Sequence, residues 1–218
     1  MSFHVHNKTT HNLSRSLVML KVNLDNEIKR LKKDLSRVEK KGVPDAAILA
    51  INDTLKLVKA GQQLEMKQKL HNPTRWTLNS LKIFPATTKT KFPKGRIFIL
   101  KNQEQYLKYQ IDGGVSRSVK GGFPVPVDRS LKNQYGNLRR GKTRLFRSKK
   151  DFYAEINGTR GIWQNVGKDN IKLRIVFSDQ NVYTKKPYDF YGRGKRIINT
   201  HFNKRMKIYS RQIKKFMK

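Results

Sequence analysis

The sequence predicts an α+β fold, with an N-terminal α-hairpin that contains a long amphipathic helix, a small antiparallel β-sheet, an extended basic loop and a C-terminal helix. Apolar residues recur every three or four positions near both ends of the chain, which is the spacing of amphipathic helices. Short runs rich in β-branched and aromatic residues lie between them, bounded by turn residues. Helices and strands segregated in this way are typical of the α+β class. The length favours a single domain over residues 1–218, with a flexible N-terminus at residues 1–12.

Two helices are expected at the start of the chain. Residues 13–38 carry a narrow stripe of Leu, Ile and Val, close to the seam of a coiled coil. Gly42 is expected to end this helix, and Pro44 to open a second helix that runs to about Leu70, since Pro73 follows. The first stripe is expected to pack either within its own domain or on a neighbouring subunit. The candidate residues for subunit packing are Leu17, Leu24, Leu31, Ala46 and Ala50.

Strand-like segments follow the helices. They are expected at residues 76–84, 96–100, 152–156, 161–164 and 172–177. Residues 105–111 suit either a short helix or a short strand. The last three strands lie close together with turn signals between them, which predicts an antiparallel meander. A C-terminal helix is expected over residues 197–216, where apolar residues return at helical spacing.

The charge is strongly unbalanced, because 49 Lys and Arg against 15 Asp and Glu give a net charge of +34. Like charges repel in a compact chain, so this excess favours work beside a polyanion or among acidic proteins. Neutralising phosphates with Lys and Arg releases counterions and gives salt-sensitive affinity. Residues 115–150 are expected to form an extended basic loop or arm that a partner orders. No acid follows Asp189, so the exposed face of the last helix is expected to be wholly cationic.

The candidate contacts to nucleic acid or to an acidic partner lie in these two segments. In the basic loop they are Arg139, Arg140, Lys142, Arg144, Arg147, Lys149 and Lys150. In the last helix they are Arg193, Lys195, Arg196, Lys204 and Arg205. Three aromatic residues near the start of that helix suit either stacking on bases or a place in the core, namely Tyr188, Phe190 and Tyr191.

The composition also limits the compartment and the chemistry. The chain has no cysteine, which excludes disulfides, thiol nucleophiles and cysteine-bound metal sites. No apolar run approaches the ~20 residues that cross a bilayer, and the start lacks the apolar segment of a secretory signal. We therefore expect a protein made in a cytoplasm, without a membrane partner, and with a composition that also suits a virion.

One nucleotide-binding pattern matches by spacing alone. Residues 136–143 read G-N-L-R-R-G-K-T, which fits the phosphate-loop pattern G-x-x-x-x-G-K-[ST]. The preceding residues 128–135 are too polar for the buried strand that such a loop follows, so we interpret the match as coincidental. Asp179 follows an apolar run and resembles a magnesium-binding Asp, but short apolar strands that end in Asp are common.

Other catalytic patterns are weak. His4 and His6 have metal-ligand spacing without Cys or carboxylate support nearby. No Ser lies in a G-x-S-x-G setting, and the acids are scattered singly, which makes a two-metal nuclease site unexpected. We expect no enzymatic activity, no metal site and no cofactor.

Six short segments, taken in chain order, carry a resemblance. The first reads V-P-D-A-A and then A-I-N-D-T, and the last reads P-Y-D-F at the entry to the final helix. The segments lie at residues 43–54, 72–87, 106–114, 135–141, 161–164 and 187–190. Together they resemble phage tail-completion and neck proteins of the minor tail protein Z family, whose helix reads P-x-A-x-A-x-A-L-N-x-T. In such proteins the G-N-x-x-R-G stretch resembles a turn in a loop.

The resemblance implies an α+β protomer that forms a homo-oligomeric ring at the head–tail junction or tail end of a virion. Its partners would be neighbouring phage connector and tail proteins, with genomic DNA passing through the ring. Its role would be to complete the tail and join it to the head. The basic loop and the last helix would then face either the DNA end or acidic neighbouring ring proteins.

The competing class is a ribosomal or other RNA-scaffold protein. High positive charge, basic extensions and a small α+β core suit that class as well, since such proteins recognise RNA largely by shape. The neutral, alanine-lined helix over residues 46–58 favours subunit packing over contact with RNA.

Overall fold

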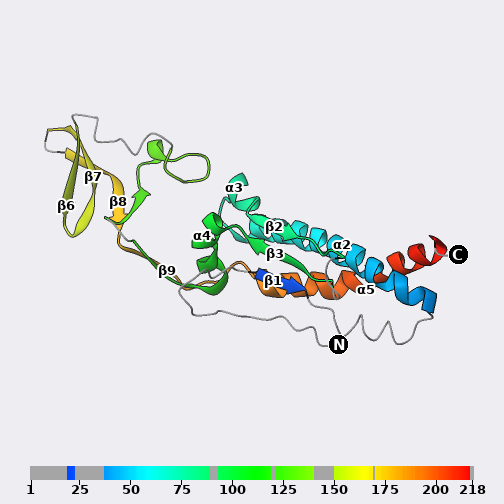
Figure 1. Ribbon diagram of the computed structural model, residues 1–218. Coiled ribbons are helices and arrows are strands. Elements are labelled where there is room, and N and C mark those ends of the chain that lie inside the picture. The colour runs from blue at the N-terminus through cyan, green and yellow to red at the C-terminus, as the bar shows by residue number, and fades with distance from the viewer. Residues whose placement is uncertain are drawn as a thin grey trace. The chain divides into compact units, whose positions relative to one another are not determined.

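The protein is described here from a computed structural model, which covers residues 19–22, 37–88, 93–118, 121–139, 150–168 and 170–216 (Figure 1). The chain forms two compact units. Unit 1 combines Met1–Ile111 with Pro187–Lys218, and unit 2 is Asp112–Lys186. Unit 2 is therefore inserted, in sequence, between two parts of unit 1. Long helices and small antiparallel sheets confirm the predicted α+β class, while the single domain expected from the length stays a prediction.

Unit 1 is built from two long helices, two short ones and a three-stranded antiparallel sheet. In chain order its elements are β1 (Met19–Val22), α2 (Arg37–Lys69), α3 (Arg75–Leu78), β2 (Leu81–Phe84), β3 (Gly95–Ile99), α4 (Lys101–Asp112) and α5 (Phe190–Phe216). The strand order is β1-β3-β2, and both β2 and β3 contact α2. α2 and α5 lie side by side along much of their length (Figure 1).

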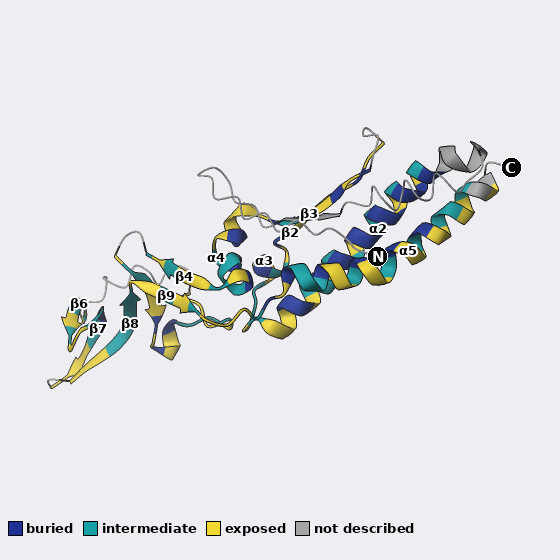
Figure 2. Cartoon of the chain, turned by 90° about the horizontal axis from the view of Figure 1, so that it is seen from below, coloured by how far each residue is buried: buried dark blue, intermediate teal, exposed yellow. Residues whose placement is uncertain are grey.

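The core of unit 1 lies around α2, whose buried residues form a continuous stripe (Figure 2). Ala46, Ala47 and Ala50 are fully buried there, because small side chains let neighbouring elements approach closely. β3 comes so close that a Cβ on Gly95 would lie 2.5 Å from Leu55 Cδ1. Tyr188 and Phe190 are also fully buried in this core, so the structure assigns them to packing rather than to base stacking.

The expected break between two N-terminal helices is wrong. α2 begins at Arg37 and continues through both Gly42 and Pro44. Gly costs a helix interior about 1 kcal/mol relative to Ala, and Pro lacks the N–H that an interior residue donates. Apolar residues on both sides of Pro44 are nonetheless buried, with Val43 at 3% exposure and Ala46 and Ala47 at 0%. Packing in the core therefore outweighs the local preference for a break.

The first helix of the predicted hairpin is also contradicted where it is described. Met19–Val22 is the strand β1, which pairs antiparallel with β3 from Met19 opposite Phe98 to Val22 opposite Gly95. β3 already pairs with β2 on its other edge, so β1 satisfies the backbone groups of its second edge. The remainder of residues 13–38, with Leu17, Leu24 and Leu31, lies outside the described residues up to Arg37.

The expected strand at residues 96–100 is confirmed as β3, and residues 105–111 belong to α4. The segment 76–84 divides into α3 and β2 instead of forming one strand. Thr74 causes this division, because its hydroxyl accepts a hydrogen bond from the Thr77 N–H at 3.1 Å and caps α3.

Unit 2 contains a four-stranded sheet, a two-stranded sheet and a 3-10 turn. Its elements are β4 (Gly114–Arg117), β5 (Phe123–Pro126), η1 (Arg129–Leu131), β6 (Asp151–Ile156), β7 (Thr159–Gly167), β8 (Asn170–Ser178) and β9 (Gln180–Tyr183). The larger sheet has the order β5-β8-β7-β6, and β4 pairs with β9. The predicted antiparallel meander is confirmed as β6, β7 and β8.

The C-terminal helix is confirmed as α5, which begins earlier than residue 197. Its start is capped by Asp189, whose carboxylate accepts a hydrogen bond from the Gly192 N–H at 2.8 Å. Buried Ile198, Phe202 and Met206 place one face of α5 against α2. Among the described helices, none combines the length and apolarity needed to span a membrane.

Candidate functional site

The cations predicted on α5 divide into two groups. Three of them pair with acids of the same unit: Arg193 Nε lies 3.5 Å from Glu65, Arg196 Nη2 3.1 Å from Asp189, and Arg205 Nη1 3.9 Å from Asp53. Arg193 and Arg205 are half-buried between α5 and α2, so part of their side chains stabilises the helix pair. Lys195 and Lys204 are exposed instead.

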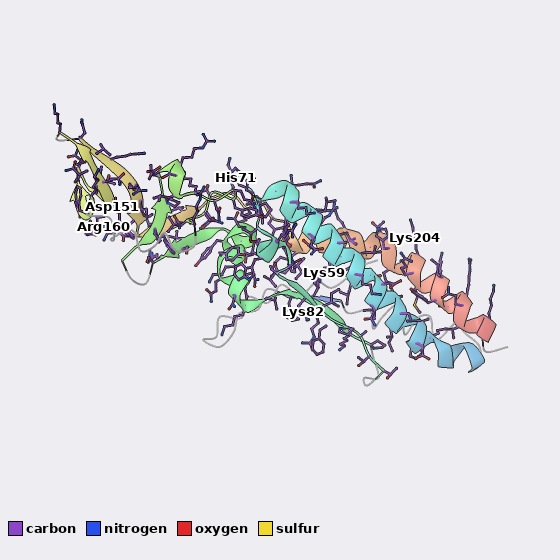
Figure 3. The ribbon with its side chains drawn as sticks, turned by 90° about the horizontal axis from the view of Figure 1, so that it is seen from above. Lys59, His71, Lys82, Asp151, Arg160 and Lys204 are labelled. Atoms are coloured by element: carbon purple, nitrogen blue, oxygen red, sulfur yellow. The ribbon has the colours of Figure 1, made fainter. Side chains whose placement is uncertain are left out.

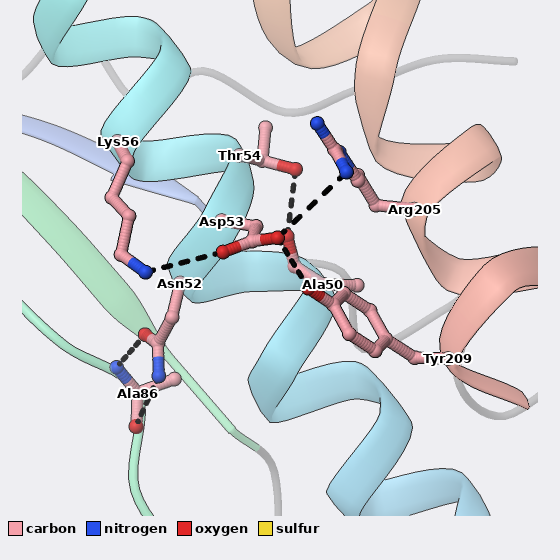
Figure 4. A network of polar contacts seen from close by, with 8 residues as sticks. All are labelled: Ala50, Asn52, Asp53, Thr54, Lys56, Ala86, Arg205 and Tyr209. Carbon is pink, nitrogen blue, oxygen red and sulfur yellow. Dashed lines mark hydrogen bonds and ion pairs between the residues drawn. The ribbon is translucent and has the colours of Figure 1, made fainter. Parts of the chain in front are cut away.

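Asp53 joins α2 to α5 through several polar contacts (Figure 4). It accepts a hydrogen bond from the Tyr209 hydroxyl and pairs with Lys56 Nζ at 3.2 Å and with Arg205. The Tyr209 hydrogen bond is the main cause of the lowered pKa of Asp53, and the same bond raises the pKa of Tyr209. The neighbouring Asn52 holds the chain after β2, since its amide makes hydrogen bonds of 2.7 and 3.1 Å to the Ala86 backbone.

A second polar cluster holds the start of α5. Gln62 donates to the Phe190 carbonyl at 2.6 Å, and Glu65 accepts from the Asp189 N–H at 3.3 Å. A Cβ on Gly61 would lie 2.3 Å from Ile197 Cδ1, so the two helices touch here. The segments that carry the resemblance, around residues 52–54 and 187–190, thus have structural roles within unit 1.

Lys204 is the first of four cations along one exposed stripe of α5. Lys204, Lys207, Arg211 and Lys215 are spaced three or four residues apart and are all exposed, and we call them the cationic row. This spacing places them on one face of a helix, opposite the buried Phe202 and Met206. Within the described part of the chain, no ion pair holds any of the four. Figure 3 labels Lys204 on α5.

The sequence analysis named only Lys204 of this row. Lys207, Arg211 and Lys215 were missed as contacts, although their signal was present. Helical spacing from Lys204, with no acid in between, would have found them.

The two candidate residues for subunit packing on α2 lie in the core of unit 1 and not on a surface that another subunit could contact. Ala46 and Ala50 are fully buried within unit 1, so neither presents a surface to another subunit. Their small side chains allow close packing inside the chain instead. The small-residue stripe predicted close packing correctly but not the partner.

The extended loop or arm expected over residues 115–150 is wrong for its first part, which contains β5, η1 and most of β4. Of its most cationic stretch, residues 139–150, the structure describes only the two ends. Arg139 Nε donates to the Lys132 carbonyl at 2.9 Å and closes a turn, and Lys150 lies just before β6. The loop cations Arg140, Lys142, Arg144, Arg147 and Lys149 lie outside the described residues, which resume at Lys150.

The phosphate-loop pattern begins in a turn. η1 precedes it, and an isolated bridge joins Lys132 to Leu138. Asn133 accepts hydrogen bonds from the Tyr135 and Asn137 N–H groups at 2.9 and 3.0 Å, which fixes Gly136 at a φ of +81°. A buried strand would precede a phosphate loop, so this geometry supports the coincidental interpretation at the start of the pattern.

Asp179, the residue that resembled a magnesium-binding Asp, forms an ion pair with Arg160. The Asp179 carboxylate is thus already paired with the Arg160 guanidinium, whereas a magnesium site would need this carboxylate as a ligand of the ion. Among the described residues, no cluster of three or more His, Asp or Glu side chains has the arrangement of a metal site.

One face of the four-stranded sheet in unit 2 is covered. Ile162 and Ile175 point to this side and pack with Leu131 from η1, and Leu138 and Phe177 complete the small core. The segment around η1 that covers this face is held to the sheet by ion pairs. Arg174 pairs with Asp128 at 3.4 Å and with Asp151 at 3.2 Å, and Lys172 also pairs with Asp128.

The opposite face of this sheet is also apolar, and we call it the open face. Strand register places Phe152 opposite Trp163, Trp163 opposite Leu173, and Val125 opposite Val176. Trp163 and Val176 alternate with Ile162 and Ile175 along their strands, so they point to the other face. A β-bulge between Ile162 and Trp163 brings Leu173 to the same face, where its Cδ1 would lie 2.7 Å from a Cβ on Gly161. Phe152 is 37% exposed and Val125 is 43% exposed, so this face meets solvent. Figure 2 shows these strands mostly in the intermediate and exposed colours.

Sequence reasoning missed the open face, although a signal for it exists. An antiparallel sheet with one solvated face shows a clean alternation of apolar and polar residues. Phe152-Tyr153-Ala154 and Ile175-Val176-Phe177 are continuous apolar runs instead. Such runs are typical of strands that are covered on both faces.

Comparison with known proteins found no matching family model, no matching curated protein and no matching solved structure.

Proposed function

We propose that this chain is a structural subunit of a phage virion at the head–tail junction or in the tail. It acts in tail completion and head–tail joining as one subunit of a ring through which DNA passes. The six segments that resemble the minor tail protein Z family support this proposal, as does a net charge of +34, which suits a place beside a polyanion.

The observation that carries the proposal is the open face of unit 2. Antiparallel sheets of single chains commonly keep one face solvated and polar. Here Phe152, Trp163, Leu173, Val176 and Val125 make the second face apolar. Exposed apolar patches of this kind mark sites of protein–protein contact. A subunit that works only within an assembly can have such an apolar face, because a neighbouring subunit covers it.

Density-gradient separation of the source lysate tests the proposal. The chain is expected to comigrate with nuclease-resistant particles, in a fixed small number of copies per particle. Comigration with ribosomal subunits that is lost on RNase treatment would instead establish an RNA-scaffold protein and overturn the proposal.

A variant pair tests whether the open face mediates assembly. Val125→Asp places a charge on the open face, and we expect the variant to fold but to be lost from particles. Val182→Asp is the matched control, because Val182 is 59% exposed on β9, outside the four-stranded sheet. Equal incorporation of both variants would exclude the open face as an assembly surface.

A further inference from the structure

We propose that the cationic row of α5 binds the phosphate backbone of a nucleic-acid duplex. The inference rests on the proposed function only in placing a polyanion beside the chain. The row itself is Lys204, Lys207, Arg211 and Lys215, presented on the solvent face of a helix whose other face is buried.

The dimensions of the row fit a phosphate backbone. Lys204 and Lys215 are eleven residues apart, which is about 16 Å along a helix at 1.5 Å per residue. A DNA strand carries one phosphate per about 3.4 Å of helix axis. The row therefore spans about five phosphates, and the flexible Lys and Arg side chains can adjust to their positions.

The charges around the row leave it available. No acid follows Asp189 in the sequence, so α5 itself supplies no competing carboxylate. The two acids of α2 that reach α5 are already paired, Glu65 with Arg193 and Asp53 with Arg205. The Asp53–Arg205 pair lies next to the row, the Glu65–Arg193 pair lies about three turns before it, and the four cations of the row are exposed. The exposed Asp45 of α2 has no ion pair with the row among the described residues.

The composition of the row favours nucleic acid over an acidic protein. Cores of protein interfaces are enriched in aromatic residues and depleted of Lys. The row has three Lys and one Arg and contains no aromatic residue, and the nearest exposed apolar side chain is Ile208. A row of this kind neutralises phosphates without reading bases, because base recognition needs donors and acceptors placed in a groove.

The anchoring of α5 makes the row a rigid element. Arg205 and Tyr209 alternate with the row along α5 and bind Asp53 of α2 (Figure 4). Phe202 and Met206 fix the same turns in the core. The four cations therefore stay aligned before a partner binds, which lowers the entropy lost on binding.

The test uses the full-length chain, a fluorescent DNA duplex of random sequence and anisotropy titrations between about 50 and 200 mM salt. In the row variant Lys204, Lys207, Arg211 and Lys215 are all changed to Gln. The control variant changes Lys67, Lys69, Lys82 and Lys101 to Gln, four exposed cations of the same unit. Both variants lose the same net charge, so a difference between them reports position and not the overall charge.

We expect the row variant to lower the slope of log Kobs against log salt by about 3.6, since each of the four lost phosphate contacts removes about 0.9. Its affinity should fall at least about a hundredfold at the lower salt concentration. The control variant should change each quantity far less. Equal losses in the two variants would overturn the inference in favour of diffuse attraction. Unchanged circular dichroism excludes misfolding as the cause.

Two further titrations identify the source of the phosphate. If an RNA duplex of equal length loses binding in the row variant as DNA does, the phosphate backbone is the ligand in either source. A strong preference for RNA would support the inference while counting against the virion proposal. If the row variant loses binding to polyglutamate but keeps binding to both duplexes, the row serves an acidic protein and the inference is overturned.

Discussion

Asp128 shows how a single carboxylate orders unit 2. A hydrogen bond from the Ser130 N–H, at 2.9 Å, is the main reason that the pKa of Asp128 is lowered to about 2. Burial opposes this lowering of the pKa, and the Ser130 side chain and Lys172 add to it. The same carboxylate pairs with Arg174, which also binds Asp151. Asp128 therefore joins η1, which covers the small core, to the four-stranded sheet.

Asp128→Asn should destabilise the chain by about 1–3 kcal/mol at neutral pH, because a charge-assisted network loses its anion. The folded pKa of about 2 is below the ordinary value of 3.8. The stabilisation from Asp128 is thus fully present above about pH 4 and is lost as the pH falls through 2. Urea unfolding at pH 7 and pH 3 checks this prediction, and the gap between wild type and variant should narrow at the lower pH.

Gly95 is required by close packing and not by backbone conformation. A Cβ there would lie 2.5 Å from Leu55 Cδ1 and 2.7 Å from Ile51 Cγ2, and both side chains are fully buried. Gly95→Ala should cost about 1–3 kcal/mol through overpacking. Leu55→Val removes the nearer atom, so the loss from Gly95→Ala should shrink in that background. Additive losses in a double-mutant cycle would contradict this explanation.

For single residues, the sequence predicted which cations are exposed better than it predicted which acids the other cations pair with. The exposed cations Lys195 and Lys204 could be named because a helix without acids must expose its lysines. The pairing of Arg193 with Glu65 and of Arg205 with Asp53 could not be predicted, since the partners lie far away in the sequence. Only the packing of α5 on α2 brings these groups together.

Among the elements, α5 depends most on contacts made by one face. Phe202 is 1% exposed against α2, whereas Ile208 on the same helix is 44% exposed. Phe202→Ala should destabilise unit 1 by about 3–5 kcal/mol, because it removes a large buried side chain and leaves a cavity. Ile208→Ala is the matched control and should change stability by less than about 0.5 kcal/mol. Helical circular dichroism during urea unfolding measures both.

The element boundaries show where periodicity stops being informative. α5 and β3 were predicted because their patterns are strong and their packing agrees with the pattern. β1 was missed because its leucine spacing also suits a helix, and only the free edge of β3 distinguishes the two. β5 was missed because two of its four residues are proline, which is rare in strands except at an edge.

For the whole molecule, the two units have separate cores. The buried cluster of unit 1 draws on α2, the three-stranded sheet, α4 and α5. That of unit 2 consists of Leu131, Ile162 and Ile175 with their neighbours. A small core stabilises a unit weakly, so we expect unit 2 to unfold at a lower urea concentration than unit 1.

Ile162→Ala tests this expectation. In a Trp76→Phe background the fluorescence of Trp163 reports unit 2, while helical circular dichroism reports unit 1, which contains all of the long helices described. The variant should shift the fluorescence transition by about 2–5 kcal/mol and leave the helical transition in place. A common shift of both signals would establish the single cooperative domain that the length predicts.

The hydrogen bond from the Tyr188 N–H to the Gln110 carbonyl, at 3.2 Å, joins the two chain segments that lead into and out of unit 2. This arrangement determines the order of events during synthesis on the ribosome. α2 emerges early, yet the helix that covers it is translated only after every residue of unit 2. The nascent chain must therefore carry an apolar helix without its partner for the time that the ribosome takes to make the insertion. Chaperone binding to nascent chains is expected to peak in that interval and to end when α5 is released.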